Sequence, residues 1–117
     1  MNETTKAWLD IVPRLAVEMK KRTNTSGFTS PFTSEEVIWM ALLMANGKIS
    51  FMGENQIEAG HMLLQRYLEM AIVAGLITSD IRIYNPRLVE WDDNLESKGL
   101  TAFVELNRHF KGPVMEH

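Results

Sequence analysis

The feature that most constrains the fold is a run of nine consecutive apolar residues at positions 37–45. Thr33 stands just before this run and Glu36 follows three residues later, which is the pattern of a helix-capping box. Gly47 lies just beyond the run, where a left-handed residue commonly ends a helix. The pattern therefore predicts a helix rather than a buried strand. A helix that is apolar on every side must lie at the centre of the fold, covered by the remaining elements.

Length and composition indicate one globular domain. The chain has 117 residues, of which 45% are hydrophobic and 23% are charged, and this is enough for a single core. It contains no cysteine, which excludes disulfides and cysteine-ligated zinc and suits a reducing compartment, so we expect a cytoplasmic protein. Residues 1–10 lack the pattern of a secretory signal. The longest apolar run is far too short to cross a bilayer, so no membrane association is expected.

The charge is unevenly distributed along the chain. Residues 1–48 hold six Lys/Arg and five Asp/Glu, whereas residues 49–117 hold six Lys/Arg and ten Asp/Glu, and the net charge is −3. Domains that bind nucleic acid usually carry a basic surface. The acidic second half therefore counts against phosphate binding.

Residues 2–22 are predicted to form an amphipathic helix, because apolar residues recur at three- and four-residue spacing. Pro13 removes a backbone donor inside it, which predicts a kink or a division into two helices. Lys20, Lys21 and Arg22 close this helix, and a solvated helix end explains them better than a phosphate contact. A loop is expected at residues 23–31.

After the central helix, residues 48–51 alternate in polarity and predict a short strand. A helical piece is expected at residues 54–59, and Gly60 then favours a break, since glycine inside a helix costs about 1 kcal/mol. A second helix would start at His61. The alternative is one uninterrupted helix over residues 55–74.

On a helical wheel this second helix has one narrow polar face, about 140° wide. His61, Gln65, Arg66 and Glu69 form that face. The apolar residues on the remaining arc are predicted to be buried against the core or against a partner. Gly75 ends the helix, and residues 76–77 return to the core as a strand begins.

Residues 81–84 and 87–91 alternate at period two and predict a β-hairpin, with Asn85 and Pro86 in its turn. A closing helix follows from about residue 95 and stops at Gly112, before a tail at residues 112–117.

Two segments resemble winged-helix regulators of the MarR or PadR kind. The first is Leu68-x-x-Ala71-x-x-x-Gly75-Leu76-Ile77, which is similar to the end of a recognition helix there. The second is residues 95–99, similar to the Leu-Thr-x-x-Gly segment after the wing, although Glu96 replaces the hydroxyl residue. The resemblance implies a mainly α fold with a small β-hairpin (α+β), a winged helix-turn-helix with an added N-terminal helix. The single domain 1–117 would comprise an N-terminal helix (1–22), a loop (23–31), a winged-helix-like core (32–111) and a tail (112–117).

The resemblance also implies a function, that of a DNA-binding transcriptional regulator that dimerises through its terminal helices. Residues of the recognition helix would read double-stranded DNA in the major groove, and arginines of the hairpin would contact phosphates or the minor groove. The implied DNA-binding residues are His61, Gln65, Arg66, Arg82 and Arg87. The recognition helix carries one cation alongside Glu69, which departs from a typical phosphate-binding surface.

Two other functions remain open. Eight methionines and the acidic second half suit a winged-helix-like module that binds a protein partner instead of DNA. A purely structural helical subunit would require the uninterrupted helix over residues 55–74. No enzyme motif, cofactor or metal site is expected. Glu105 and His109 are one helical turn apart, but no third ligand accompanies them.

Overall fold

The computed structural model describes residues 1–22, 33–51 and 53–111, and most of these residues are helical. The predicted loop at 23–31, Phe32 and the predicted tail at 112–117 lie outside the described residues. The elements are α1 (Glu3–Arg22), α2 (Ser34–Ala45), β1 (Ser50–Phe51), β2 (Glu54–Asn55), α3 (Ile57–Val73), the 3₁₀ helices η1 (Ile81–Tyr84) and η2 (Pro86–Leu88), and α4 (Asp93–Lys111). The predicted mainly α class is confirmed.

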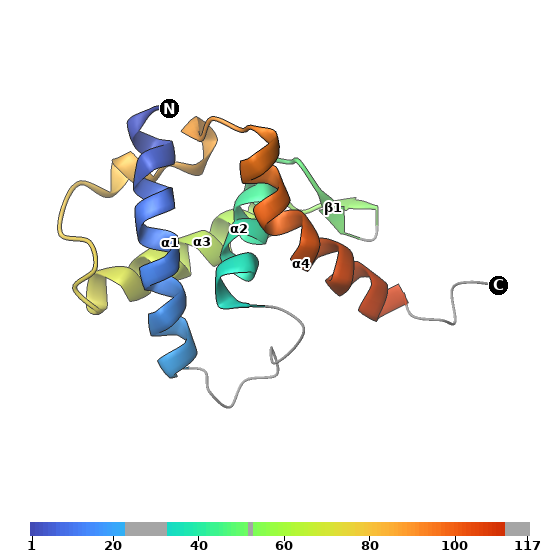
Figure 1. Cartoon of the computed structure of the whole chain (residues 1–117), viewed down its shortest axis with the longest axis horizontal. Helices are drawn as coiled ribbons and strands as arrows, with labels where there is room; N and C mark the ends of the chain where they lie inside the picture. Colours follow the sequence, from blue (N-terminus) through green and yellow to red (C-terminus); the bar gives the residue numbers. More distant parts are fainter. Residues whose placement is uncertain (23–32, 52, 112–117) are drawn as a thin grey trace.

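Helix α2 lies at the centre, with α1, α3 and α4 arranged around it (Figure 1). All nine residues from 37 to 45 are buried, as the apolar run predicted. Thr33 is the N-cap, as predicted, because its Oγ1 accepts a hydrogen bond of 3.1 Å from the Glu36 amide. Beyond the helix, Gly47 has a φ of 69°. This position favours glycine, since other residues rarely adopt a positive φ.

Two glycines bring the neighbouring helices close to the α2 backbone. A Cβ atom on Gly60 of α3 would lie 2.4 Å from the amide nitrogen of Ala45 and 2.9 Å from the carbonyl oxygen of Ala41. A Cβ atom on Gly99 of α4 would lie 2.7 Å from the amide nitrogen of Met40. Backbone atoms cannot move aside as the end of a long side chain can. Both helix contacts therefore require glycine.

The predicted helix break at Gly60 is wrong. Helix α3 runs without interruption through Gly60, as the alternative of one long helix had it. The reason is tertiary: the intrinsic cost of a helical glycine, about 1 kcal/mol, is offset by the close packing of α3 on α2 that the missing side chain allows.

Helix α1 is one helix that contains Pro13, so of the two predicted alternatives, a kink or a division into two helices, the division is wrong. Pro13 is exposed, and the opposite face buries Trp8, Ile11, Val12 and Leu15 in the core. At the end of α1, Lys21 and Arg22 pair with Glu18 at 3.4 and 3.8 Å. These exposed contacts fit the expectation of a solvated helix end.

The β-hairpin is formed by β1 and β2, which pair antiparallel with Ser50 opposite Asn55. The turn includes Gly53, whose φ is 81°. The predicted strand at residues 48–51 is thus confirmed in its second half. The prediction of a helical piece from Glu54 is wrong at Glu54 and Asn55, which are extended.

The hairpin predicted at residues 81–91 is wrong. Residues 81–84 and 86–88 form the 3₁₀ helices η1 and η2 instead. Asp80 Oδ1 accepts a hydrogen bond of 2.9 Å from the Arg82 amide, and Asn85 Oδ1 accepts one of 3.1 Å from the Arg87 amide. These side chains cap the two turns, and Pro86 supplies a first helical residue without an amide donor. Apolar alternation was therefore compatible with strands, but local capping favours 3₁₀ turns.

Between α3 and α4 the described residues contain no strand, so the wing implied by the resemblance is not found there. The strand expected from residue 76 is likewise wrong, although Ile77 is buried in the core as predicted. Within the described ranges, no helix combines the length and apolar character needed to span a membrane.

Candidate interaction site on α3

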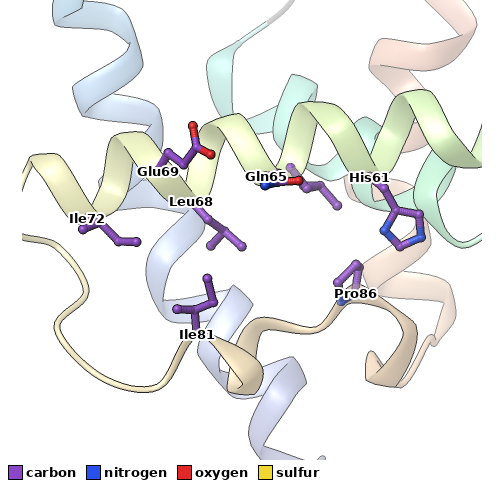
Figure 2. A pocket seen from close by; sticks show the side chains of 8 residues that line it. His61, Gln65, Leu68, Glu69, Ile72, Ile81 and Pro86 are labelled. Carbon is purple, nitrogen blue, oxygen red and sulfur yellow. The ribbon is translucent and has the colours of Figure 1, made fainter.

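An apolar groove of about 240 Å³ separates α3 from the segment that carries η1 and η2. Figure 2 shows Leu68 and Ile81 directed toward each other across it, and His61 directed toward Pro86. Its lining consists of His61, Leu64, Gln65, Leu68, Glu69, Ile72, Ile81 and Pro86. The floor is aliphatic and the rim carries polar groups, a combination that suits an apolar side chain with a polar neighbour.

The segment that carries η1 and η2 forms one wall of the groove, and hydrogen bonds join this wall to the N-terminal residues 2–8. The indole Nε1 of Trp8 donates a hydrogen bond of 3.0 Å to the Tyr84 carbonyl, and the two rings meet edge to face at a centroid distance of 5.8 Å. Thr5 Oγ1 accepts a hydrogen bond of 2.8 Å from the Glu90 amide, and Asn2 Nδ2 donates one of 2.7 Å to the Leu88 carbonyl. The position of the wall therefore depends on α1.

A Thr5→Val variant is expected to lose about 1–2 kcal/mol of unfolding free energy, because the Glu90 amide loses its acceptor in a partly buried place. Thr5→Ser is the matched control, since it keeps the hydroxyl group and removes only a methyl group. Urea denaturation of both variants gives the comparison. Equal losses in the two variants would show that the hydrogen bond contributes nothing.

The structure brings together two of the five predicted site residues. His61 and Gln65 both line the groove. Arg66 is exposed on α3, but it points about 100° away from Gln65 around the helix and does not line the groove. Arg82 and Arg87 are exposed on the opposite wall and do not line the groove. The five residues thus do not form one continuous surface around the groove.

His61 has an unsatisfied polar atom. Its Nε2 is buried and has no hydrogen-bond partner among the described residues. A buried polar group without a partner lowers stability.

Arg82 is engaged by its own neighbour. Its Nε donates a hydrogen bond of 2.6 Å to Asp80 Oδ2, and a second guanidinium nitrogen pairs with the same oxygen. This hydrogen bond is the main reason that the pKa of the Asp80 carboxyl lies below its usual value of 3.8. A phosphate would have to compete with Asp80 for this arginine.

An Arg82→Ala variant should return the Asp80 pKa toward 3.8, because the hydrogen bond that lowers it is lost. The sign follows from linkage: a depressed carboxyl pKa contributes stability above the unfolded-state pKa, and this contribution is lost as pH falls through the folded-state pKa. NMR titration of the Asp80 carboxyl carbon measures the shift. Arg87→Ala is the control, and an unchanged Asp80 pKa in Arg82→Ala would contradict the prediction.

Exposed apolar side chains are concentrated on α3 and the 3₁₀ segment, and of these Ile72 and Ile81 line the groove. Among the described residues, five of the nine large exposed apolar side chains belong to α3 or to the 3₁₀ segment. They are Met62, Ile72, Val73, Ile81 and Leu88. The helical wheel predicted that Met62, Ile72 and Val73 are buried against the core or against a partner. In the structure they are exposed, so no described part of this chain covers them.

Comparison with protein-family models, with curated proteins and with solved structures yields no match for this chain. The winged-helix resemblance therefore remains a prediction from sequence, and the functional interpretation rests on the geometry of α3 and its surroundings.

Proposed function

We propose that this chain is a protein-interaction module and that its groove receives apolar side chains of a partner polypeptide. The observation that carries the proposal is the aliphatic groove between α3 and the 3₁₀ segment, whose lining includes the exposed apolar residues Ile72 and Ile81. Contiguous exposed apolar surface on a small domain is typical of interaction sites. The sequence had left open a module that binds a protein partner, and this proposal names the residues that would do so.

The size of the groove favours a polypeptide over a small molecule. Its volume of about 240 Å³ is below the range of about 300–1,000 Å³ typical of small-molecule pockets. One or two side chains of an amphipathic helix or an extended segment would occupy it and contact the exposed Ile72 and Ile81 of its lining. Gln65, which is exposed and lines the groove, would hydrogen-bond the partner's polar atoms.

Selection of a randomised peptide library on the full chain tests this function. Enriched peptides should carry paired apolar residues, should shift the NMR signals of residues that line the groove, and should bind Ile81→Glu at least about tenfold more weakly, a loss of about 1.4 kcal/mol. Val104→Glu is the matched control, because Val104 is equally exposed on α4, outside the groove. Failure to enrich peptides, or equal binding to Ile81→Glu and the parent chain, would refute the proposal.

A second candidate is the DNA-binding regulator that the resemblance implies. It is favoured by the exposure of Gln65, Arg66 and Arg87, whose side chains are open to solvent. Fluorescence anisotropy with duplex DNA at low ionic strength tests it: binding should weaken steeply with salt and in Arg66→Ala and Arg87→Ala. Absence of a salt-dependent signal would exclude it.

A further inference from the structure

We propose that a second copy of this chain pairs with α3 antiparallel, along a stripe formed by Met62, Arg66, Glu69 and Val73. The pairing places Met62 against Val73 of the second copy and Arg66 against Glu69 of the second copy. The stripe shares only Glu69 with the lining of the groove, and its partner is a second copy of this chain, so this inference goes beyond the proposed function.

The stripe is the most outward line of α3. At about 100° per residue, its four members fall within an arc of about 60°. The buried residues of the helix are Gly60, Leu64, Leu68 and Ala71, and their arc is centred about 180° away. The spacing of four, three and four residues is that of a seam between two packed helices. A helix of a second copy can therefore approach the stripe from the side of α3 that faces away from the core.

The stripe ends are apolar and uncovered. Met62 is 60% exposed and Val73 is 74% exposed, although residues of this kind are usually buried on a folded domain. In an antiparallel pair of identical helices, the two-fold axis passes through one point of each helix, the centre of the contact. A residue on one side of this centre faces, on the other helix, the residue at the same distance on the opposite side. Met62 and Val73 are equally far from a centre between Tyr67 and Leu68. The pairing thus covers both apolar ends at once.

The charges at the middle of the stripe are complementary under the same symmetry. Arg66 and Glu69 are equally far from the same centre, so each arginine faces a glutamate of the second copy. Both side chains are exposed, and in the described part of the chain neither takes part in an ion pair. A parallel arrangement would bring like charges together instead. Charge and apolar contact therefore select the antiparallel orientation.

The expected dimer is weak. One pair of helices in contact over three turns covers less surface than the about 1,200–2,000 Å² of standard stable interfaces. The dimer should accordingly form in a concentration-dependent way. This location differs from the terminal helices expected from sequence, where exposed Leu100 and Val104 on α4 would be the contact.

Charge reversal tests the pairing in sedimentation velocity runs over a concentration series. Arg66→Glu and Glu69→Arg should each weaken dimerisation at least about tenfold, because each places like charges opposite one another at two symmetric positions. The double variant Arg66→Glu/Glu69→Arg should restore it. Lys6→Glu, an equal charge change at an exposed residue of α1, should have no effect.

Cysteine cross-linking tests the register, and the cysteine-free chain gives no background. A mixture of Met62→Cys and Val73→Cys chains should form a mixed disulfide dimer, whereas each variant alone should not. In the proposed register two copies of position 62 lie about 16 Å apart, because eleven residues separate the facing positions at 1.5 Å each, and a disulfide needs Cα atoms within about 7 Å.

Four results would overturn the inference. These are a monomer at every concentration, a dimer that Arg66→Glu leaves intact, a double variant as weak as the single ones, and a dimer that Val104→Glu disrupts. The peptide test of the groove changes Ile81, whereas the sedimentation test of the stripe changes Arg66 and Glu69. Either proposal can therefore fail while the other stands.

Discussion

Replacing Gly60 by alanine is expected to lower the unfolding free energy by about 1–3 kcal/mol, although alanine is the better helix former. The added Cβ would lie 2.4 Å from the Ala45 amide nitrogen, well inside van der Waals contact with the backbone of α2. Helix α3 must then move away from α2. Urea denaturation and thermal melting measure the loss, which corresponds to about 4 °C in Tm per kcal/mol for a chain of this size.

Ala59→Gly is the control for Gly60→Ala. Ala59 is the exposed neighbour on the same helix, so its replacement reports helix propensity alone and should cost at most about 1 kcal/mol. Gly99→Ala should resemble Gly60→Ala, because its Cβ meets α2 from the other side. A Gly60→Ala chain as stable as the parent would show that α3 and α2 do not make this close contact.

Replacing Trp8 by alanine is expected to cost about 3–5 kcal/mol, a large part of the stability of about 5–15 kcal/mol typical of domains. Trp8 is fully buried and is the largest side chain that α1 contributes to the core. The loss includes its contact with the Tyr84 ring and its hydrogen bond to the Tyr84 carbonyl. Urea denaturation followed by circular dichroism measures the effect.

Trp8→Phe keeps an aromatic ring and removes the indole donor, so it tests the same contact in a chain that still folds. We expect a loss of about 1–3 kcal/mol and faster amide exchange in residues 84–90, since the Tyr84 carbonyl loses its partner. Val17→Ala is the control, because Val17 is exposed on the same helix and its loss should stay within about 0.5 kcal/mol. Unchanged exchange in residues 84–90 of Trp8→Phe would contradict the role of Trp8 in holding the groove wall.

Features set by neighbouring residues could be predicted from sequence. The capping box at Thr33 and the apolar run after it identified α2 and its central place, and Gly47 marked where it ends. The capped turns at Asp80 and Asn85 were also local signals. The alternation of apolar residues nevertheless led to the prediction of strands. Consecutive 3₁₀ turns can show the same alternation when a short segment directs its apolar side chains into the core.

Features that depend on distant elements could not be predicted. A glycine that breaks a helix and a glycine that lets two helices touch look alike in sequence, and only the position of Ala45 distinguishes them at Gly60. The wheel of α3 assigned Met62 and Val73 to the covered arc, but both are exposed, and no local pattern says whether another part of the chain covers them. The pairing of Arg82 with Asp80 spans two residues and was open to prediction.

The hydrogen bonds between residues 84–90 and residues 2–8 determine when the groove can form during synthesis of the chain. The three hydrogen bonds that hold the groove wall join positions 76, 85 and 86 residues apart. A ribosome-bound chain that has exposed α1, α2 and α3 still lacks that wall, and closing so long a loop comes late in folding. Under the proposed function, partner binding through the groove would therefore begin only after the segment before α4 has emerged.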